Sequence, residues 1–280
     1  MLETIKNLTS TEYIISRLTK VCDSVDFEKN GTVIAYIRSS DHTSPLMLAT
    51  HIDLPHFICM GKDNDRFSLH YVGNIGKCEL DECPAVSESG VKCTVSTDDS
   101  KVAATSDEPL AIGELVYVDT PVAEEDGRIC RHGISALAPA AALLLTAEKL
   151  SASRPTRDVY FAFTAEGQHS YKLYADAARR CGAAEAVCIG AIDESSSENV
   201  SVRICDRSFS SDKRLSDKLV ASGATPVLLR EGRCAASTVQ LHGIPTCELD
   251  IPVKDAGAAK ESVKECHINA LAEILTDFIK

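Results

Sequence analysis

Three polar segments of the sequence follow apolar, strand-like runs and carry residue types that metal chemistry uses. The segments are 51–53, 166–169 and 193–194. In an open α/β sheet the carboxyl ends of neighbouring strands meet at one edge, where ligands bind. A histidine and two carboxylates at such an edge have the chemistry to bind a divalent metal. The same residue types also serve as plain strand ends and turns, so the pattern alone leaves both interpretations open.

The spacing of His51 and Asp53 puts both side chains on the same face of an extended chain. Asp53 is therefore expected to support the imidazole of His51 from behind. Two further histidines, His132 and His169, lie near the same expected edge. With His51 and Asp193 they would form a mononuclear zinc site of three histidines and one carboxylate. The alternative is that His132 and His169 are ordinary loop histidines.

A thiol is a third candidate for chemistry. Cys234 follows Arg230 and Arg233, whose charges would lower the pKa of the thiol, and His242 lies on the same segment. The chain contains 12 cysteines, and this abundance favours a packing role for Cys234 instead.

The elements that must position these segments alternate between helix and strand after residue 134. The runs 158–164, 187–192 and 246–251 are apolar on both faces and predict buried strands. Strands of this kind are typical of a doubly covered, mostly parallel α/β sheet. The segments 134–150 and 259–279 have the composition and spacing of helices.

Residues 55–128 have a different pattern. Short alternating segments are separated by acidic, glycine and serine turns, and no helical pattern of useful length appears. This pattern predicts a small antiparallel, barrel-like β-domain of five or six strands. Residues 1–54 and 129–280 would then form one α/β domain, with 55–128 inserted after its second strand.

Composition limits the class of protein. The 280 residues carry a net charge of −12, which argues against nucleic acid or a membrane as a partner. The N-terminus lacks the apolar stretch of a signal peptide. The apolar run 134–147 is interrupted by Ser135 and Pro139 and is too short to span a bilayer. We therefore expect a cytoplasmic protein.

Several motifs occur in an order and spacing that is fairly specific when taken together. They are Leu46 to Asp53, Ile112 to Val118, Asp126 to Ile129, Asp158 to Thr164, Ala191 to Asp193, Asp206 to Ser208 and Ile251-Pro252. In this respect the chain resembles the dinuclear-metal aminopeptidases that assemble as tetrahedral particles, some of which are labelled cellulases or endoglucanases. The resemblance covers nearly the whole chain. It implies a zinc-aminopeptidase type of α/β fold and a large homo-oligomer with subunit contacts through the inserted domain.

The resemblance also implies five metal ligands and a catalytic glutamate, of which His51 and Asp193 are retained. The other positions are replaced: Ser135 stands at the bridging aspartate, Gly167 at the catalytic glutamate, Gln168 at the ligand glutamate and Gly257 at the last histidine. Two adjacent cations need a bridging anion and several carboxylates, and Gly167 offers no general base. A shift of one residue would bring Glu166 to the base position without restoring the ligand glutamate.

Two main hypotheses follow. In the first, the chain is an aminopeptidase relative that has lost the metal centre and catalysis. It then binds a peptide or small molecule, or has a structural role as a partner subunit. In the second, it is an active aminopeptidase that holds one zinc or cobalt ion in the rebuilt mononuclear site and cleaves N-terminal peptide bonds. A thiol-based activity at Cys234 is a third hypothesis.

Overall fold

Runs that are apolar on both faces form the centre of an eight-stranded sheet in the computed structural model. The structure describes residues 1–39, 44–73, 80, 82–98, 101–165, 171–229 and 234–280. The strands of this sheet, in spatial order, are β1 (Ser24–Phe27), β2 (Val33–Ile37), β12 (Val159–Thr164), β3 (Leu46–His51), β13 (Glu185–Asp193), β16 (Thr246–Val253), β14 (Ser201–Cys205) and β15 (Thr225–Leu228).

The four central strands, β12, β3, β13 and β16, run parallel to one another. Antiparallel pairings flank them, because β2 pairs antiparallel with β12 and β14 pairs antiparallel with β16. The predicted parallel sheet is thus confirmed at its centre, within a mixed sheet.

Helices cover both faces of the sheet, as predicted. They are α1 (Leu2–Asn7), α2 (Thr11–Leu18), α3 (Ile134–Ala152), α4 (Lys172–Arg180), α5 (Lys213–Ala221), α6 (Ala236–Gln240) and α7 (Glu265–Ile279). Apolar side chains of α3 and α7 share one core with Leu249 and Ile251 of β16. Apolar side chains of α4 and α6 share a second core with Ala49 of β3 and Cys188 of β13. The alternation of side chains along each central strand therefore supplies two cores, one on each face.

Helix α3 is long and apolar enough by composition to cross a membrane, but 72% of its apolar window is buried within the protein. It begins after Gly133, whose φ of 75° lies in the left-handed region that glycine adopts readily. A Cβ at this position would lie 2.8 Å from the Leu54 side chain. We assign α3 as a core helix of the α/β body.

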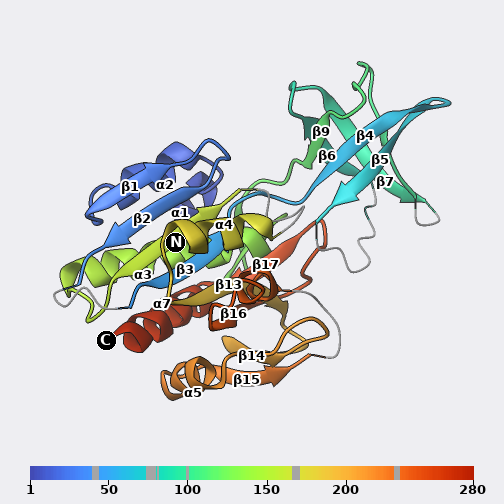
Figure 1. The fold of residues 1–280 in the computed structure, drawn as a ribbon. Coiled ribbons are helices and arrows are strands. Elements are labelled where there is room, and N and C mark those ends of the chain that lie inside the picture. Colours follow the sequence, from blue (N-terminus) through green and yellow to red (C-terminus); the bar gives the residue numbers. More distant parts are fainter. Residues whose placement is uncertain (40–43, 74–79, 81, 99–100, 166–170, 230–233) are drawn as a thin grey trace.

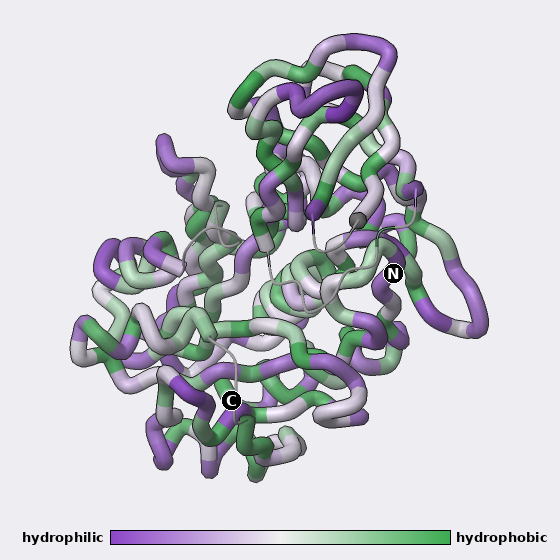
Figure 2. Tube along the Cα trace, turned by 90° about the vertical axis from the view of Figure 1, so that its right-hand side faces the viewer, coloured by the Kyte–Doolittle hydropathy of each residue, from purple (hydrophilic) through white to green (hydrophobic). Residues whose placement is uncertain are grey.

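The segment that follows β3 forms a closed six-stranded barrel, which projects from the α/β body in both views (Figures 1 and 2). Phe57, Val95 and Val116 lie in its core. Its strands are β4 (His56–Asp63), β5 (Arg66–Val72), β6 (Cys83–Ser87), β7 (Lys92–Asp98), β8 (Lys101–Thr105) and β9 (Leu115–Val118). The predicted barrel-like β-domain is present, whereas the limits 55 and 128 stay a prediction.

The C-terminal helix begins later than predicted. Residues Glu261–Lys264 form strand β17, and helix α7 starts only at Glu265. Strand β17 pairs with β11 (Arg128–Arg131), which also pairs with β10 (Ala123–Glu125). The first part of the predicted helix is extended because it completes this three-stranded sheet.

Candidate functional site

The carboxyl ends of the central parallel strands bring the first two predicted ligands to one edge of the sheet. His51 is the last residue of β3 and lies opposite Thr164 at the end of β12. Asp193 is the last residue of β13 and lies opposite Val253 of β16. Strands β3 and β13 are neighbours, and from this edge the chain leads into the barrel (Figure 1).

His51 and Asp53 are in direct contact. The Nδ1 atom of His51 lies 3.1 Å from Oδ1 of Asp53, and the two side chains are 16% and 19% exposed. This pairing holds the imidazole through Nδ1 and directs Nε2 away from the carboxylate. It is the arrangement by which a carboxylate orients a metal-binding histidine.

The side chain of Asp193 is engaged within its own turn. Its Oδ1 accepts hydrogen bonds from the backbone N–H of Ser195 at 2.9 Å and from the Ser195 hydroxyl at 2.5 Å. The next residue, Glu194, pairs with both Nη atoms of Arg128 at 2.9 and 3.2 Å. Although burial opposes the shift, Arg128 lowers the pKa of Glu194. Glu194 is therefore an ionised partner of arginine.

His132 is almost completely buried, with 2% exposure. Its Nδ1 lies 3.0 Å from the carbonyl oxygen of Ala258, and its Nε2 is buried without a hydrogen-bond partner among the described residues. Burial lowers the pKa of His132, so the ring is neutral at pH 7. A neutral imidazole that donates through Nδ1 has an acceptor lone pair on Nε2.

Ser135 and Gly257, which stand at two replaced ligand positions, are joined by a carboxylate that the sequence analysis did not identify. Oε2 of the fully buried Glu261 accepts the backbone N–H of Ser135 at 2.7 Å. Oε1 accepts the Ser135 hydroxyl at 3.1 Å and the backbone N–H of Gly257 at 2.6 Å. Burial raises the pKa of Glu261, and these hydrogen bonds only partly offset the shift. Glu261 thus ties the start of α3 to the turn before β17.

The described residues do not fit a dinuclear metal centre. No three His, Cys, Asp or Glu side chains in this part of the chain are grouped so as to hold a metal ion. His51, Asp193 and His132 therefore do not form such a set by themselves. Glu166, Gly167, Gln168 and His169 lie outside the described residues, so the set that includes His169 stays a prediction.

The thiol hypothesis for Cys234 receives no support from its surroundings. Cys234 is 1% exposed, and burial together with the nearby Glu248 strongly raises the pKa of its thiol. The sequence had predicted the opposite, namely that Arg230 and Arg233 lower this pKa. His242 is exposed, and Arg230 and Arg233 lie outside the described residues. Desolvation dominates, so Cys234 has the properties of a packing residue.

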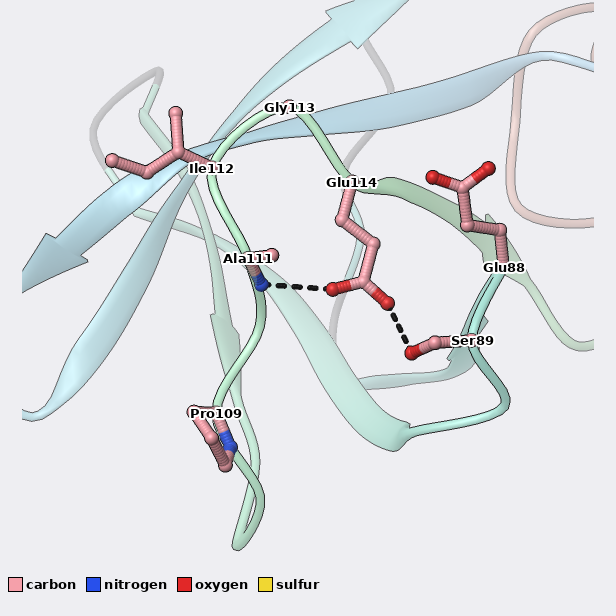
Figure 3. Close-up of a pocket in the computed structure, with 7 residues that line it drawn as sticks. All are labelled: Glu88, Ser89, Pro109, Ala111, Ile112, Gly113 and Glu114. Carbon is pink, nitrogen blue, oxygen red and sulfur yellow. Dashed lines mark hydrogen bonds between the residues drawn. The ribbon is translucent and has the colours of Figure 1, made fainter.

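The barrel carries a pocket of about 520 Å³ between the turn after β6 and the segment before β9 (Figure 3). Glu114 points into this region and accepts hydrogen bonds from Ala111 N–H at 2.8 Å and from the Ser89 hydroxyl. These bonds and one from Ser87 hold the pKa of Glu114 at about 2. A carboxylate held ionised in this way is a poor general base.

The comparisons with known proteins place the fold. No family model matches the chain, and no curated protein matches it by sequence. Solved structures do match the chain. One is the aminopeptidase APDkam598 from the archaeon Desulfurococcus kamchatkensis, with a TM-score of 0.89 at 16% identity. The match covers 99% of this chain and 94% of that one. A TET aminopeptidase from a marine-sediment thaumarchaeon has a TM-score of 0.89 at 12% identity, covering 99% and 95%. The TET1 peptidase of Pyrococcus horikoshii, which assembles into a tetrahedron or a large octahedral shell, has a TM-score of 0.80 at 17% identity, covering 96% and 92%.

The mixed sheet with its inserted barrel defines the class: the chain has an α/β fold of the aminopeptidase type. More particularly, it has the fold of the tetrahedral (TET) aminopeptidases. The resemblance drawn from the sequence motifs is confirmed at the level of the fold.

Proposed function

We propose that this chain is a non-catalytic relative of the tetrahedral aminopeptidases that uses the edge of its sheet to bind a peptide or small molecule. The observation that carries the proposal is the junction at Glu261. Ser135 and Gly257, which the resemblance aligns with a bridging aspartate and a histidine ligand, have neither a carboxylate nor an imidazole. Their backbone N–H groups instead share one buried carboxylate.

In this proposal, hydrogen bonds within the protein stand where the resemblance implies metal ligands. Two divalent cations 3.5–4 Å apart, as in two-metal sites, need several anionic oxygens directed at them. The Glu261 carboxylate is directed at N–H groups and at the Ser135 hydroxyl, so three of its roughly four lone-pair positions are already used. The arrangement suits a rigid, metal-free edge.

A second candidate is the mononuclear metallo-aminopeptidase. The contact between His51 and Asp53 favours it, because a carboxylate behind Nδ1 leaves Nε2 available for a metal. This candidate requires His169 or another undescribed side chain, together with His51 and Asp193, to complete the ligand set. Zinc or cobalt would supply a polarised water to attack the peptide carbonyl.

Activity and binding assays separate the two candidates. The chain is incubated with zinc or cobalt and tested on a panel of peptides with different N-terminal residues. The non-catalytic proposal expects no chelator-sensitive hydrolysis, together with saturable binding of at least one peptide. Chelator-sensitive hydrolysis that is lost in His51→Ala and retained in the exposed-site control His242→Ala would overturn it in favour of the second candidate.

We also propose that the chain is a cytoplasmic homo-oligomer with no nucleic-acid or membrane partner. The net charge of −12 and the assemblies named for similar structures support this proposal. Analytical ultracentrifugation tests the assembly, and sedimentation as a monomer at micromolar concentration would contradict it.

A further inference from the structure

Two carboxyl side chains are buried on the face of β16 that helix α6 covers. Glu248 is 4% exposed and Asp250 is fully buried. A Cβ at Gly190 of the neighbouring strand β13 would lie 2.9 Å from Oε1 of Glu248 and 2.9 Å from Oδ1 of Asp250. The two carboxyl oxygens therefore face the same small space above Gly190.

The one described cation at this cluster, Arg203, already pairs with two other carboxylates. The guanidinium of Arg203, on β14, donates to Asp250 through Nε at 3.0 Å and through Nη2 at 2.9 Å. Its Nη1 donates to Asp206 at 3.1 Å. Three buried carboxyl groups thus face one guanidinium, and Glu248 is the one that the described structure does not pair with a cation.

Glu248 is instead bonded to helix α6. Its Oε2 accepts the backbone N–H of Ala236, the first residue of this helix, at 3.0 Å. The other titratable groups whose charges bear on Glu248 are phenols and thiols with raised pKa values, and these are neutral at pH 7: Tyr171, Tyr174, Cys188, Cys234 and Cys247. None of them can compensate a negative charge on Glu248.

We propose that the closing of α6 over β16 takes up one proton, which the carboxyl group of Glu248 then holds. In the closed state Glu248 is neutral, and Asp250 remains ionised against Arg203. Asp250 and Asp206 already share one guanidinium, so ionising Glu248 as well would place a third negative charge beside it in a buried site, which is costly. That charge reaches water only if the helix that covers it moves away. Helix α6 therefore stays closed over β16 only while Glu248 holds this proton, and we call this arrangement the latch.

The direction of the pH effect follows because the closed and open states bind different numbers of protons. Burial, and next the charge of Asp250, raise the pKa of Glu248 to about 8, against an ordinary value of 4.5. Between these two values the open state releases a proton that the closed state keeps. Opening of α6 should thus increase as the pH rises from 6 towards 8.

Hydrogen exchange of the peptide that covers α6 tests the latch in the whole chain. Wild type is compared with Glu248→Gln, which keeps an acceptor for Ala236 but cannot titrate. Asp217→Asn, an exposed carboxylate on α5, is the matched control. Relative to Glu248→Gln, wild type should lose protection in α6 as the pH rises from 6 to 8, and Asp217→Asn should behave as wild type.

Two hydrogen-exchange results would overturn the latch. One is an equal pH dependence of α6 exchange in wild type and Glu248→Gln. The other is a pH-dependent loss that spreads evenly over the whole core, which would indicate global unfolding. The infrared band of a neutral carboxyl should be present in wild type at pH 7 and weaker in Glu248→Gln. The comparison is needed because burial also raises the pKa of Glu261. A spectrum of wild type with ionised carboxylates only, or an unchanged band in Glu248→Gln, would also contradict the proposal.

Discussion

Glu261 accepts the backbone N–H of Ser135 at 2.7 Å, although 126 residues separate the two in sequence. Through its other oxygen it accepts the N–H of Gly257. One buried carboxylate therefore fixes the first turn of α3 and the turn before β17 at the same point. Both partners stand where the resemblance implies metal ligands. Under the proposed function, these two positions form a hydrogen-bonded joint in place of metal ligands.

Removing this carboxylate should be costly. Glu261→Ala leaves two buried N–H groups without acceptors, and we expect the free energy of unfolding to fall by about 3 kcal/mol. Glu261→Gln keeps one acceptor oxygen and should cost less than the alanine variant. Urea unfolding measures both variants, with the exposed Glu273→Ala as the control. If Glu261→Ala lowers the free energy of unfolding no more than Glu273→Ala does, the structural role of Glu261 is contradicted.

Gly190 provides the space that the carboxyl groups of Glu248 and Asp250 border. We expect Gly190→Ala to lower the free energy of unfolding by about 1–3 kcal/mol, because the added Cβ would lie 2.9 Å from both carboxyl groups. In a Glu248→Ala background the same change should cost less, because one of the two contacts is gone. Additive losses in this double-mutant cycle would show that the alanine methyl and Glu248 do not compete for space.

The barrel should be sensitive to acid through Glu114. Hydrogen bonds from Ser87 and Ser89, and from the N–H of Ala111, hold the pKa of Glu114 at about 2, below its ordinary 4.5. The stabilisation is therefore fully present above about pH 4.5 and is lost as the pH falls towards 2. Urea unfolding at pH 6 and pH 3 should show that Glu114→Gln is less stable than wild type at pH 6, with a smaller difference at pH 3. The exposed Glu108→Gln should match wild type at both, and a pH-independent difference for Glu114→Gln would refute this role.

Cysteine reactivity should follow exposure. Cys266 is exposed, whereas Cys234 is buried with a raised pKa. Brief alkylation at neutral pH, followed by peptide mapping, should therefore modify Cys266 well before Cys234. Faster modification of Cys234 would revive the thiol hypothesis.

Sequence patterns predicted the elements whose periodicity is local. The apolar runs became β12, β13 and β16, and the alternating segments after β3 became the barrel. The pattern failed at 261–264, where four residues with no strong periodicity are extended because β11, more than a hundred residues away, pairs with them. Pairing of this kind depends on tertiary structure and leaves little local signal.

The candidate site was only partly predictable for a similar reason. His51 and Asp53 are two residues apart, and their contact follows from strand geometry. Glu261 gave no local signal, because its partners are distant backbone N–H groups. Glu248 and Asp250 did give a signal, since charged residues alternate with apolar ones within an otherwise apolar strand. Their partner Arg203 lies on another strand, so the sequence could not show how the charges are compensated.

The metal content of the chain tests the central claim most directly. The protein is purified without chelator or affinity metal, measured for metal per chain, and measured again after excess zinc or cobalt has been added and removed. The proposed loss of the metal centre predicts well under one retained ion per chain in both measurements. One or two tightly held ions per chain, lost in His51→Ala, would contradict the account and would show that residues outside the described part of the chain complete a working metal site.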